Sequence, residues 1–284
     1  MTFSQNQLQS TIPEWIAEWT NLQHLALDGN QFYGTIPSSI ASLQNLERLE
    51  LQENPQLRGR FDVLFSNPNS NSTLERGGPQ MSLQHLDLSD TNLEGELPAT
   101  ILPALKFLRL WNVNGLGGTL PTEIGSWSNL ESFSVKENPQ LKGSIPTELG
   151  LLPNLEVLEV LENNFMSGTL PTELGHISSR LKIISLRYNN QTGTLPIEWS
   201  NIRDLQLLDV STNRLEGTVP AEYSKLTQLR ILDLRGTRLE GAIPEGVCFL
   251  ESREEFFADC STFSENSVAK LQCQCCIGCS GGRA

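Results

Sequence analysis

Aliphatic residues recur at fixed positions along most of the chain. In one stretch, Leu155, Leu158 and Val160 precede Asn163 in the pattern L-x-x-L-x-L-x-x-N. Side chains alternate between the two faces of a β-strand, so Leu158 and Val160 share one face. The pattern therefore predicts a short strand with one buried face. The residues expected to point into solvent are Val157, Glu159 and Leu161.

The same frame occurs nine times, and each copy opens with a leucine. The copies follow one another at intervals of 22 to 26 residues, apart from one interval of 37. Repetition at such a period is typical of stacked-repeat folds, so each copy is expected to add one strand to a parallel sheet. The opening residues are Leu22, Leu46, Leu83, Leu105, Leu130, Leu155, Leu181, Leu205 and Leu229.

Two further positions complete each copy. The asparagine, as at Asn163, is expected to be buried and to satisfy backbone N–H and C=O groups where the chain leaves the strand. Thr91, Val113 and Thr237 replace it in three copies, and we expect the copies around Val113 to be locally weaker or specialised. An aliphatic–proline pair follows the asparagine. Proline suits the first turn of a short helix or 3₁₀ segment, where its missing N–H has no partner to lose.

The complete pattern, L-x-x-L-x-L-x-x-N-x-L-x-G-x-I-P, resembles the plant-type leucine-rich repeat over about residues 6–247. This class includes plant receptor-kinase ectodomains, polygalacturonase inhibitors and many diatom proteins. The resemblance implies an α/β fold, a right-handed solenoid with a parallel sheet on its concave face and short helices or 3₁₀ turns on its convex face. Such proteins bind many different partners, so the resemblance names no ligand.

The pattern also predicts the organisation of the chain. We expect one solenoid over residues 1–247 and a cysteine-rich cap and tail over residues 248–284. Residues 1–20 form a partial repeat that lacks its strand, so we expect the natural protein to continue upstream, where a membrane anchor could lie. The first residues have neither the charged region nor the apolar run of a signal peptide. Residues 66–80 have the composition of a loop insertion.

All six cysteines follow the repeats: Cys248, Cys260, Cys273, Cys275, Cys276 and Cys279. The end of a solenoid exposes its core and needs a cap, and disulfides stabilise short segments that bury little surface. We therefore predict a disulfide-bonded cap, with the pairing open because six cysteines allow fifteen connectivities. The C-x-x-C spacing of Cys276 and Cys279 leaves a metal site or a redox dithiol as alternatives. The tail resembles the cysteine-rich ends of diatom leucine-rich-repeat proteins, although Ser280 stands where a further cysteine is frequent.

The exposed face of the predicted sheet is the expected binding site. A strand facing water is ordinarily polar there, yet aromatic and aliphatic residues occur within four adjacent copies, with charged residues between them. Aromatic and arginine anchors in polar surroundings are typical of protein interfaces. We predict a protein- or peptide-binding surface formed by Phe107, Arg109, Trp111, Asn112, Lys136, Val157, Glu159, Leu161, Arg187 and Tyr188.

The net charge and the positions of the histidines argue against two further classes of function. A net charge of −13 argues against a nucleic-acid partner, which requires a basic surface. The three histidines, His24, His85 and His176, are not arranged with cysteine or serine as in a catalytic site, so we expect no enzyme activity, cofactor or metal. N-glycosylation acceptors occur at Asn71 and Asn190 and have meaning only in a secreted protein.

Together these features favour a monomeric, non-catalytic recognition module, either a receptor-like ectodomain or a secreted binding protein, located outside the cell or at its surface. One alternative is an inhibitor of a secreted polysaccharide hydrolase, as the resemblance to polygalacturonase inhibitors implies. Another is an intracellular scaffold with a zinc-binding cysteine cluster.

Overall fold

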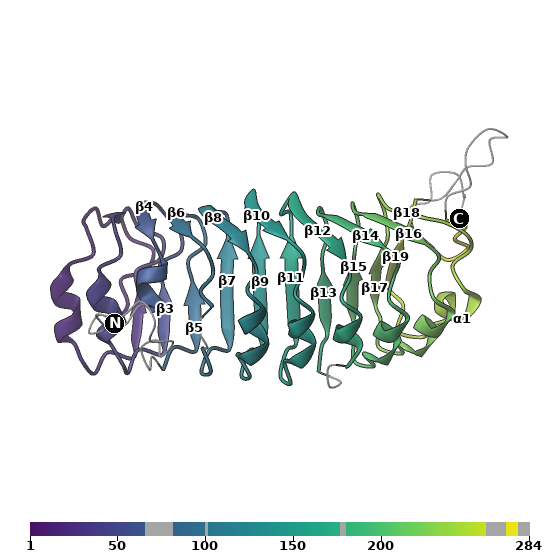
Figure 1. Cartoon of the computed structure of the whole chain (residues 1–284), viewed down its shortest axis with the longest axis horizontal. Helices are drawn as coiled ribbons and strands as arrows, with labels where there is room; N and C mark the ends of the chain where they lie inside the picture. The colour runs from purple at the N-terminus through teal and green to yellow at the C-terminus, as the bar shows by residue number, and fades with distance from the viewer. Residues whose placement is uncertain (66–81, 100–101, 177–179, 260–270, 278–284) are drawn as a thin grey trace. The chain divides into compact units, whose positions relative to one another are not determined.

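The computed structural model of the protein (Figure 1) describes residues 1–65, 82–99, 102–176, 180–259 and 271–277. It comprises two compact units, Met1–Lys142 and Gly143–Ala284. The insertion predicted at residues 66–80 lies outside the described residues.

In the first unit, each copy of the repeat contributes one strand to a first parallel sheet and one strand to a second. The first sheet has the order β1-β3-β5-β7-β9, with β1 (His24–Ala26), β3 (Arg48–Glu50), β5 (His85–Asp87), β7 (Phe107–Trp111) and β9 (Ser132–Lys136). The second sheet has the order β2-β4-β6-β8-β10, with β2 (Tyr33–Gly34), β4 (Asn54–Arg60), β6 (Thr91–Gly95), β8 (Val113–Thr119) and β10 (Gln140–Gly143).

The second unit repeats this arrangement. Its first sheet has the order β11-β13-β15-β17-β19, with β11 (Val157–Leu161), β13 (Ile183–Ser185), β15 (Leu207–Asp209), β17 (Ile231–Asp233) and β19 (Glu255–Phe257). Its second sheet has the order β12-β14-β16-β18, with β12 (Phe165–Thr169), β14 (Asn190–Gly193), β16 (Arg214–Gly217) and β18 (Arg238–Leu239).

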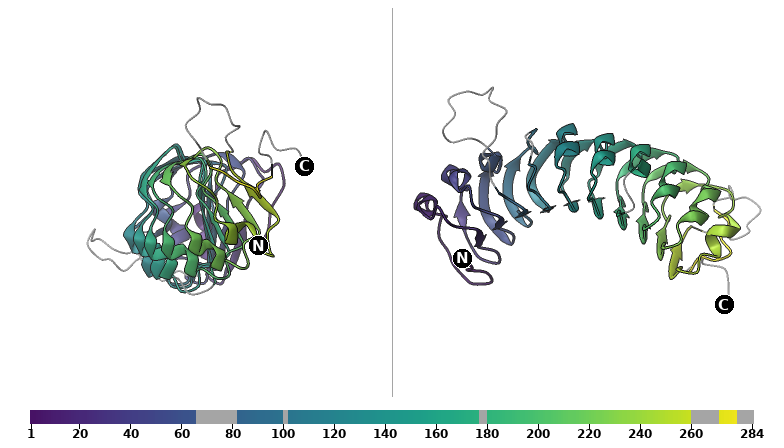
Figure 2. Two further views of the ribbon diagram at one scale, coloured as in Figure 1. Left: turned by 90° about the vertical axis from the view of Figure 1, so that its right-hand side faces the viewer. Right: turned by 90° about the horizontal axis from the view of Figure 1, so that it is seen from below.

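Short 3₁₀ segments stack along one side of each unit (Figure 2), and all of them except η3 (Asp62–Phe65) follow an aliphatic–proline pair. The first unit contains η1 (Glu14–Glu18), η2 (Ser38–Ser42), η3 (Asp62–Phe65) and η4 (Thr122–Ser126). The second contains η5 (Thr147–Leu151), η6 (Thr172–His176), η7 (Ile197–Asn201), η8 (Ala221–Lys225) and one short α-helix, α1 (Glu245–Cys248). None of the helices in the described ranges has the length and apolar character that a membrane crossing requires.

The predicted solenoid architecture, with its parallel sheet and 3₁₀ segments, is confirmed. The second sheet was not predicted. It forms because the residues after the asparagine alternate between a buried aliphatic side chain and a turn glycine. Gly168, for example, has a φ of +99°, which side chains rarely adopt, and a Cβ there would lie 3.0 Å from the Ser144 Cβ.

The asparagines form the predicted ladder of buried amides. The Asn54 Oδ1 accepts the N–H of Phe32 in the preceding copy at 3.0 Å. Its Nδ2 donates to the carbonyl oxygens of Leu27 at 3.0 Å and Leu51 at 2.9 Å, and the side chain is fully buried. One amide therefore satisfies backbone groups of two successive copies, which joins each copy to its neighbour.

Candidate functional site

Trp111 is held in a defined position on the first sheet of the first unit. It lies at the end of β7, half-buried, and its indole N–H donates to the hydroxyl of Ser134 on β9 at 2.6 Å. The Arg109 guanidinium lies 4.6 Å from the centroid of the indole ring, and the Lys136 Nζ lies 5.7 Å from it. Both distances are within the range of cation–π attraction, so the ring and the two cations form one cluster.

A buried carboxylate positions Arg109. The Arg109 Nη1 lies 3.5 Å from the Oδ2 of Asp87, whose side chain is only 4% exposed, whereas half of the Arg109 side chain is exposed. Burial raises the pKa of Asp87, although hydrogen bonds from Ser89 and the charge of Arg109 act in the opposite direction. Arg109 therefore has one anchored edge and further N–H groups that face solvent.

Phe107 is 40% exposed, as the sequence predicts for a surface contact residue. Its ring packs against His85 on the neighbouring strand, with a centroid separation of 5.7 Å. Burial, followed by the charges of Arg48 and Arg109, lowers the pKa of His85 to about 4. His85 is therefore neutral at physiological pH and extends the aromatic surface of Phe107.

Asn112 belongs to a row of residues with left-handed backbone. These residues precede the asparagine position in successive copies and have positive φ angles: Glu53, Asp90, Asn112, Glu137, Glu162, Tyr188 and Thr212. The N–H of Asn112 donates to the Lys136 carbonyl at 2.8 Å, and its side chain donates to the Asp90 carboxylate at 2.9 Å. Nothing in the sequence indicates this left-handed conformation, because no glycine marks these positions.

In the second unit, Arg187 and Tyr188 form a comparable pair. Tyr188 is 49% exposed, and the Arg187 guanidinium lies 5.9 Å from the centroid of its ring. The Arg187 Nη2 also lies 2.9 Å from the Glu162 Oε1. Val157 and Glu159 are half-buried on β11. All four predicted site residues are thus accessible on the first sheet or at its edge.

The prediction that Leu161 points into solvent is wrong. Only 6% of its surface is exposed, so its apolar character reflects the core and not a binding surface. Instead, four half-buried aliphatic residues stand in register across β11 to β17: Val157, Ile183, Leu207 and Ile231. Their repetition at one position was visible in the sequence, but only Val157 was included in the predicted site.

The cysteines of the tail are paired. Cys248 is bonded to Cys275 and Cys273 to Cys276, so the four cysteines that lie in the described ranges contain no free thiol. The predicted disulfide-bonded cap is confirmed for these residues, while Cys260 and Cys279 lie outside them.

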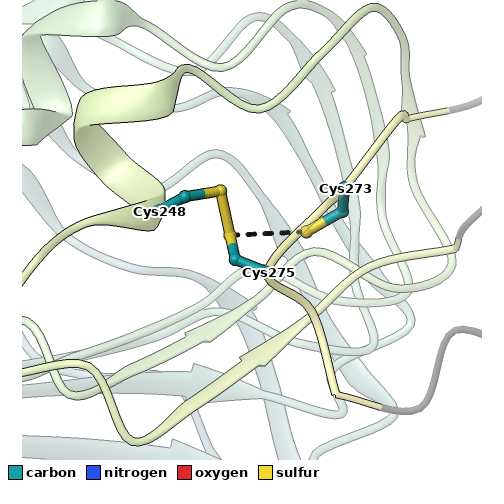
Figure 3. Close-up of side chains that lie close together, drawn as sticks. All are labelled: Cys248, Cys273 and Cys275. Atoms are coloured by element: carbon teal, nitrogen blue, oxygen red, sulfur yellow. Dashed lines mark hydrogen bonds between the residues drawn. A yellow bond between two sulfur atoms is a disulfide. The ribbon is translucent and has the colours of Figure 1, made fainter. Parts of the chain in front are cut away.

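The sulfur atoms of Cys248, Cys273 and Cys275 form a compact cluster (Figure 3). The Cys273 Sγ lies 3.7 Å from the Cys275 Sγ, and the sulfurs of Cys248, Cys273 and Cys275 lie within 4.8 Å of one another. Three reduced thiolates at these distances would suit a zinc ion. In the disulfide-bonded state they are not available as ligands.

Of the two glycosylation acceptors, Asn71 lies outside the described residues. Asn190 is half-exposed at the start of β14, and its side-chain nitrogen donates to the Asn164 carbonyl. Modification of this nitrogen would have to replace that hydrogen bond.

Comparison with known proteins identifies the repeat. The model of the Leucine Rich Repeat family matches residues 21–43, 82–103 and 228–250. None of the curated protein sequences matches the chain significantly.

Several solved structures resemble the chain. The plant peptide hormone receptor RGFR1, in complex with RGF2, is 30% identical with a TM-score of 0.79, over 96% of this chain and 40% of the receptor chain. The TDR receptor is 32% identical with a TM-score of 0.78, over 91% and 42%. The Arabidopsis receptor kinase HAESA, in complex with the peptide hormone IDA and the co-receptor SERK1, is 28% identical with a TM-score of 0.78, over 95% and 43%.

The chain thus spans about two fifths of the length of these receptor chains. The repeat pattern, the two parallel sheets with their asparagine ladder, and these matches agree with one another. The chain is a leucine-rich-repeat protein of the plant type.

Proposed function

We propose that the chain is a non-catalytic recognition module that binds a peptide or a protein segment on the exposed face of the first sheet. The cluster of Trp111, Arg109 and Lys136 carries this proposal. An aromatic ring whose edge is fixed by Ser134 loses little side-chain entropy when a partner covers it. Tryptophan and arginine in such settings account for much of the binding energy of protein interfaces.

The second unit offers a surface of the same character. Tyr188 and Arg187 supply an aromatic ring and a cation, and the in-register aliphatic residues that include Val157 and Ile183 supply apolar area. Glu159 adds an acidic group on the same strand. An extended peptide with alternating apolar and charged side chains would match these two kinds of position.

The solved relatives support a peptide as the partner. RGFR1, a plant peptide hormone receptor, was solved in complex with RGF2, and HAESA was solved in complex with the peptide hormone IDA. The chain covers less than half of either receptor chain, so we extend to it only the class of ligand and not a particular hormone. The disulfides of the cap favour an extracellular or cell-surface location, since such bonds persist in oxidising compartments.

The experiment is a selection of peptides from a random 12-residue phage-displayed library, with the intact, non-reduced chain as bait. Affinities of the enriched peptides are then measured for the wild-type chain and for Trp111→Ala and Tyr188→Ala. We expect at least one enriched sequence family to lose tenfold or more in affinity with one of these variants.

The matched control is Tyr33→Ala. Tyr33 is 43% exposed, an exposure similar to that of Tyr188, but it lies on β2 of the second sheet. Its replacement should leave the affinities unchanged. Peptides that bind all three variants as tightly as the wild type, or a library that yields no enriched family, would contradict the proposal.

A further inference from the structure

The second sheet of the first unit contains a hollow of about 460 Å³. None of the residues that line it belongs to the proposed peptide-binding surface on the first sheet. This volume is within the range of small-molecule sites in proteins. It lies over four neighbouring strands, β4, β6, β8 and β10, and its lining includes Arg58, Asn92, Glu94, Asn114, Gly115 and Gln140.

The hollow exists because β8 lacks side chains where its neighbours have them. Gly115 pairs with Glu94 on β6, and Gly117 pairs with Gln140 on β10. A Cβ at Gly115 would lie 2.5 Å from the Glu94 Cβ, so no larger residue fits without a shift of the strand. The same copy has Val113 in place of the ladder asparagine. The deviation from the repeat pattern and the hollow therefore coincide.

The strand pairing is irregular at the same place. The register shifts between Asn54 and Arg58 in the β4–β6 pair, and between Thr91 and Glu94 in the β6–β8 pair. Bulges of this kind redirect side chains and are common near functional sites.

The side chains around the hollow are polar, and several of them have no hydrogen-bond partner in the described ranges. Arg58, Asn92 and Glu94 are exposed and, within the described ranges, their side chains form no hydrogen bond or ion pair. Gln140 donates to the Asn114 carbonyl at 2.9 Å, which leaves its side-chain oxygen as an acceptor. The rim thus combines a guanidinium and amides as donors with a carboxylate and amide oxygens as acceptors.

This composition selects among ligand classes. The charges of Arg58 and Glu94 cancel, so neither an anion nor a cation is favoured. A hydrophobic ligand would leave these polar groups unpaired and desolvated, which costs free energy. A ligand rich in hydroxyl groups, each of which both donates and accepts, would satisfy them. We propose that the hollow formed by Arg58, Asn92, Glu94 and Gly115 is a binding site for a neutral saccharide.

The test uses ¹⁵N-labelled, non-reduced full chain titrated with cellotriose, maltotriose and N,N′,N″-triacetylchitotriose in turn. At least one of these neutral trisaccharides should shift the backbone amide signals of β6 and β8. Asn92→Ala and Glu94→Ala should each weaken that binding about tenfold or more, because each removes a direct hydrogen-bonding group.

The repeat supplies matched controls. Arg214 and Glu216 occupy in β16 the positions that Asn92 and Glu94 occupy in β6, and both are exposed. Arg214→Ala and Glu216→Ala should bind the saccharide like the wild type. Trp111→Ala should also bind normally, which separates this site from the proposed peptide surface.

Three outcomes would overturn the saccharide site. The first is that none of the trisaccharides shifts the β6 and β8 signals at about 20 mM, a concentration that reveals even millimolar affinity. The second is that the controls in β16 weaken binding as much as Asn92→Ala and Glu94→Ala. The third is that a neutral Gly-Ser peptide shifts these signals while the saccharides do not.

Discussion

The Asn138 Oδ1 accepts the backbone N–H of Val113 at 3.0 Å. The Asn138 Nδ2 also donates to the Leu110 carbonyl at 2.8 Å, while Thr91 donates its hydroxyl to the Leu88 carbonyl at 2.7 Å. Asn138 therefore satisfies the backbone around Val113, whose own side chain contributes no hydrogen bond, whereas Thr91 bonds only within its own copy. The copy without a ladder asparagine depends on Asn138.

Replacement of Asn138 by alanine should lower the free energy of unfolding by about 3 kcal/mol or more. The backbone groups of Val113 and Leu110 would lose their partners in a fully buried position, and each orphaned group costs roughly 1–3 kcal/mol. Thr237→Ala is the comparison, because Thr237 makes a single bond to the Leu234 carbonyl. Denaturant-induced unfolding should show the larger loss for Asn138→Ala, and equal losses would contradict this account.

Gln191 is a polar residue at an apolar position. Its side chain is fully buried, and neither its Oε1 nor its Nε2 has a hydrogen-bond partner in the described structure. The equivalent residues in neighbouring second-sheet strands are Met166 and Leu215. Gln191→Leu should therefore raise the free energy of unfolding by about 1–3 kcal/mol, since it removes an unpaired buried amide.

The reverse substitution, Leu215→Gln, should destabilise the chain by a similar or larger amount. Both variants are compared with the wild type in urea, where the midpoint of unfolding is measured. A midpoint that is unchanged or lower in Gln191→Leu would mean that the Gln191 amide is satisfied.

The sequence predicted the regular part of the fold because each repeat position has one physical requirement. Leu158 and Val160 are in the core, and Asn163 is buried as the ladder requires. The second sheet was missed because each of its strands, which come directly after the asparagine, has only one consistently apolar position. One such position does not form the alternating pattern that predicts a strand. Leu161 was misplaced because alternation assigns a face but cannot show how deeply neighbouring residues cover it.

The candidate site was predicted less completely. Phe107 and Tyr188 could be recognised because an exposed aromatic residue breaks the expected polar pattern. The burial of Asp87 and the orientation of Arg109 depend on packing between strands, which a single sequence does not contain. The hollow beside Gly115 depends on two register shifts, and these too have no sequence signature.

Ser134→Ala should weaken binding of a Trp111-dependent peptide by about threefold to tenfold without unfolding the chain. The indole N–H would lose its partner, so the ring would no longer be fixed before binding. The affected peptides are those selected as described above, and their affinities are measured by calorimetry. The far-ultraviolet circular dichroism of the variant should be unchanged. An unaltered affinity would show that the Ser134 hydrogen bond does not preorganise Trp111.

His85 should make stability depend on pH. Folding lowers its pKa to about 4, below the ordinary value of 6.5, so between these values the unfolded chain binds a proton that the folded chain does not. The free energy of unfolding therefore falls as the pH falls from 6.5 to 4. The contribution is about 1–2 kcal/mol after allowance for the partial exposure of the ring.

The effect is measured as the difference between the wild type and His85→Gln across this pH range. Burial raises the pKa of Asp87, which acts in the opposite direction in acid, so the wild-type curve alone would mislead. His24→Gln is the control, because His24 occupies the corresponding position on β1 and 58% of its side chain is exposed. Identical pH slopes for the wild type and His85→Gln would contradict the prediction.

The two disulfides should contribute unequally to stability. Cys248 and Cys275 are separated by 27 residues, and Cys273 and Cys276 by 3. In the chain-entropy model, a bond that closes the longer loop stabilises by about 3–4 kcal/mol, against about 2 kcal/mol for the shorter one. The Cys248→Ser/Cys275→Ser double variant should therefore unfold at a lower temperature than Cys273→Ser/Cys276→Ser.

A metal-bound cap would behave differently. Removal of any ligand of a zinc site should cost a similar amount, and a chelator should lower the unfolding temperature of the wild type. With disulfides, the chelator should have no effect, whereas a reductant should lower that temperature. Without reductant, an alkylating reagent should add no mass at Cys248, Cys273, Cys275 or Cys276. Alkylation of these residues after chelation alone would show that the cap is a metal site and is not disulfide-bonded. That result would favour an intracellular scaffold over a secreted receptor.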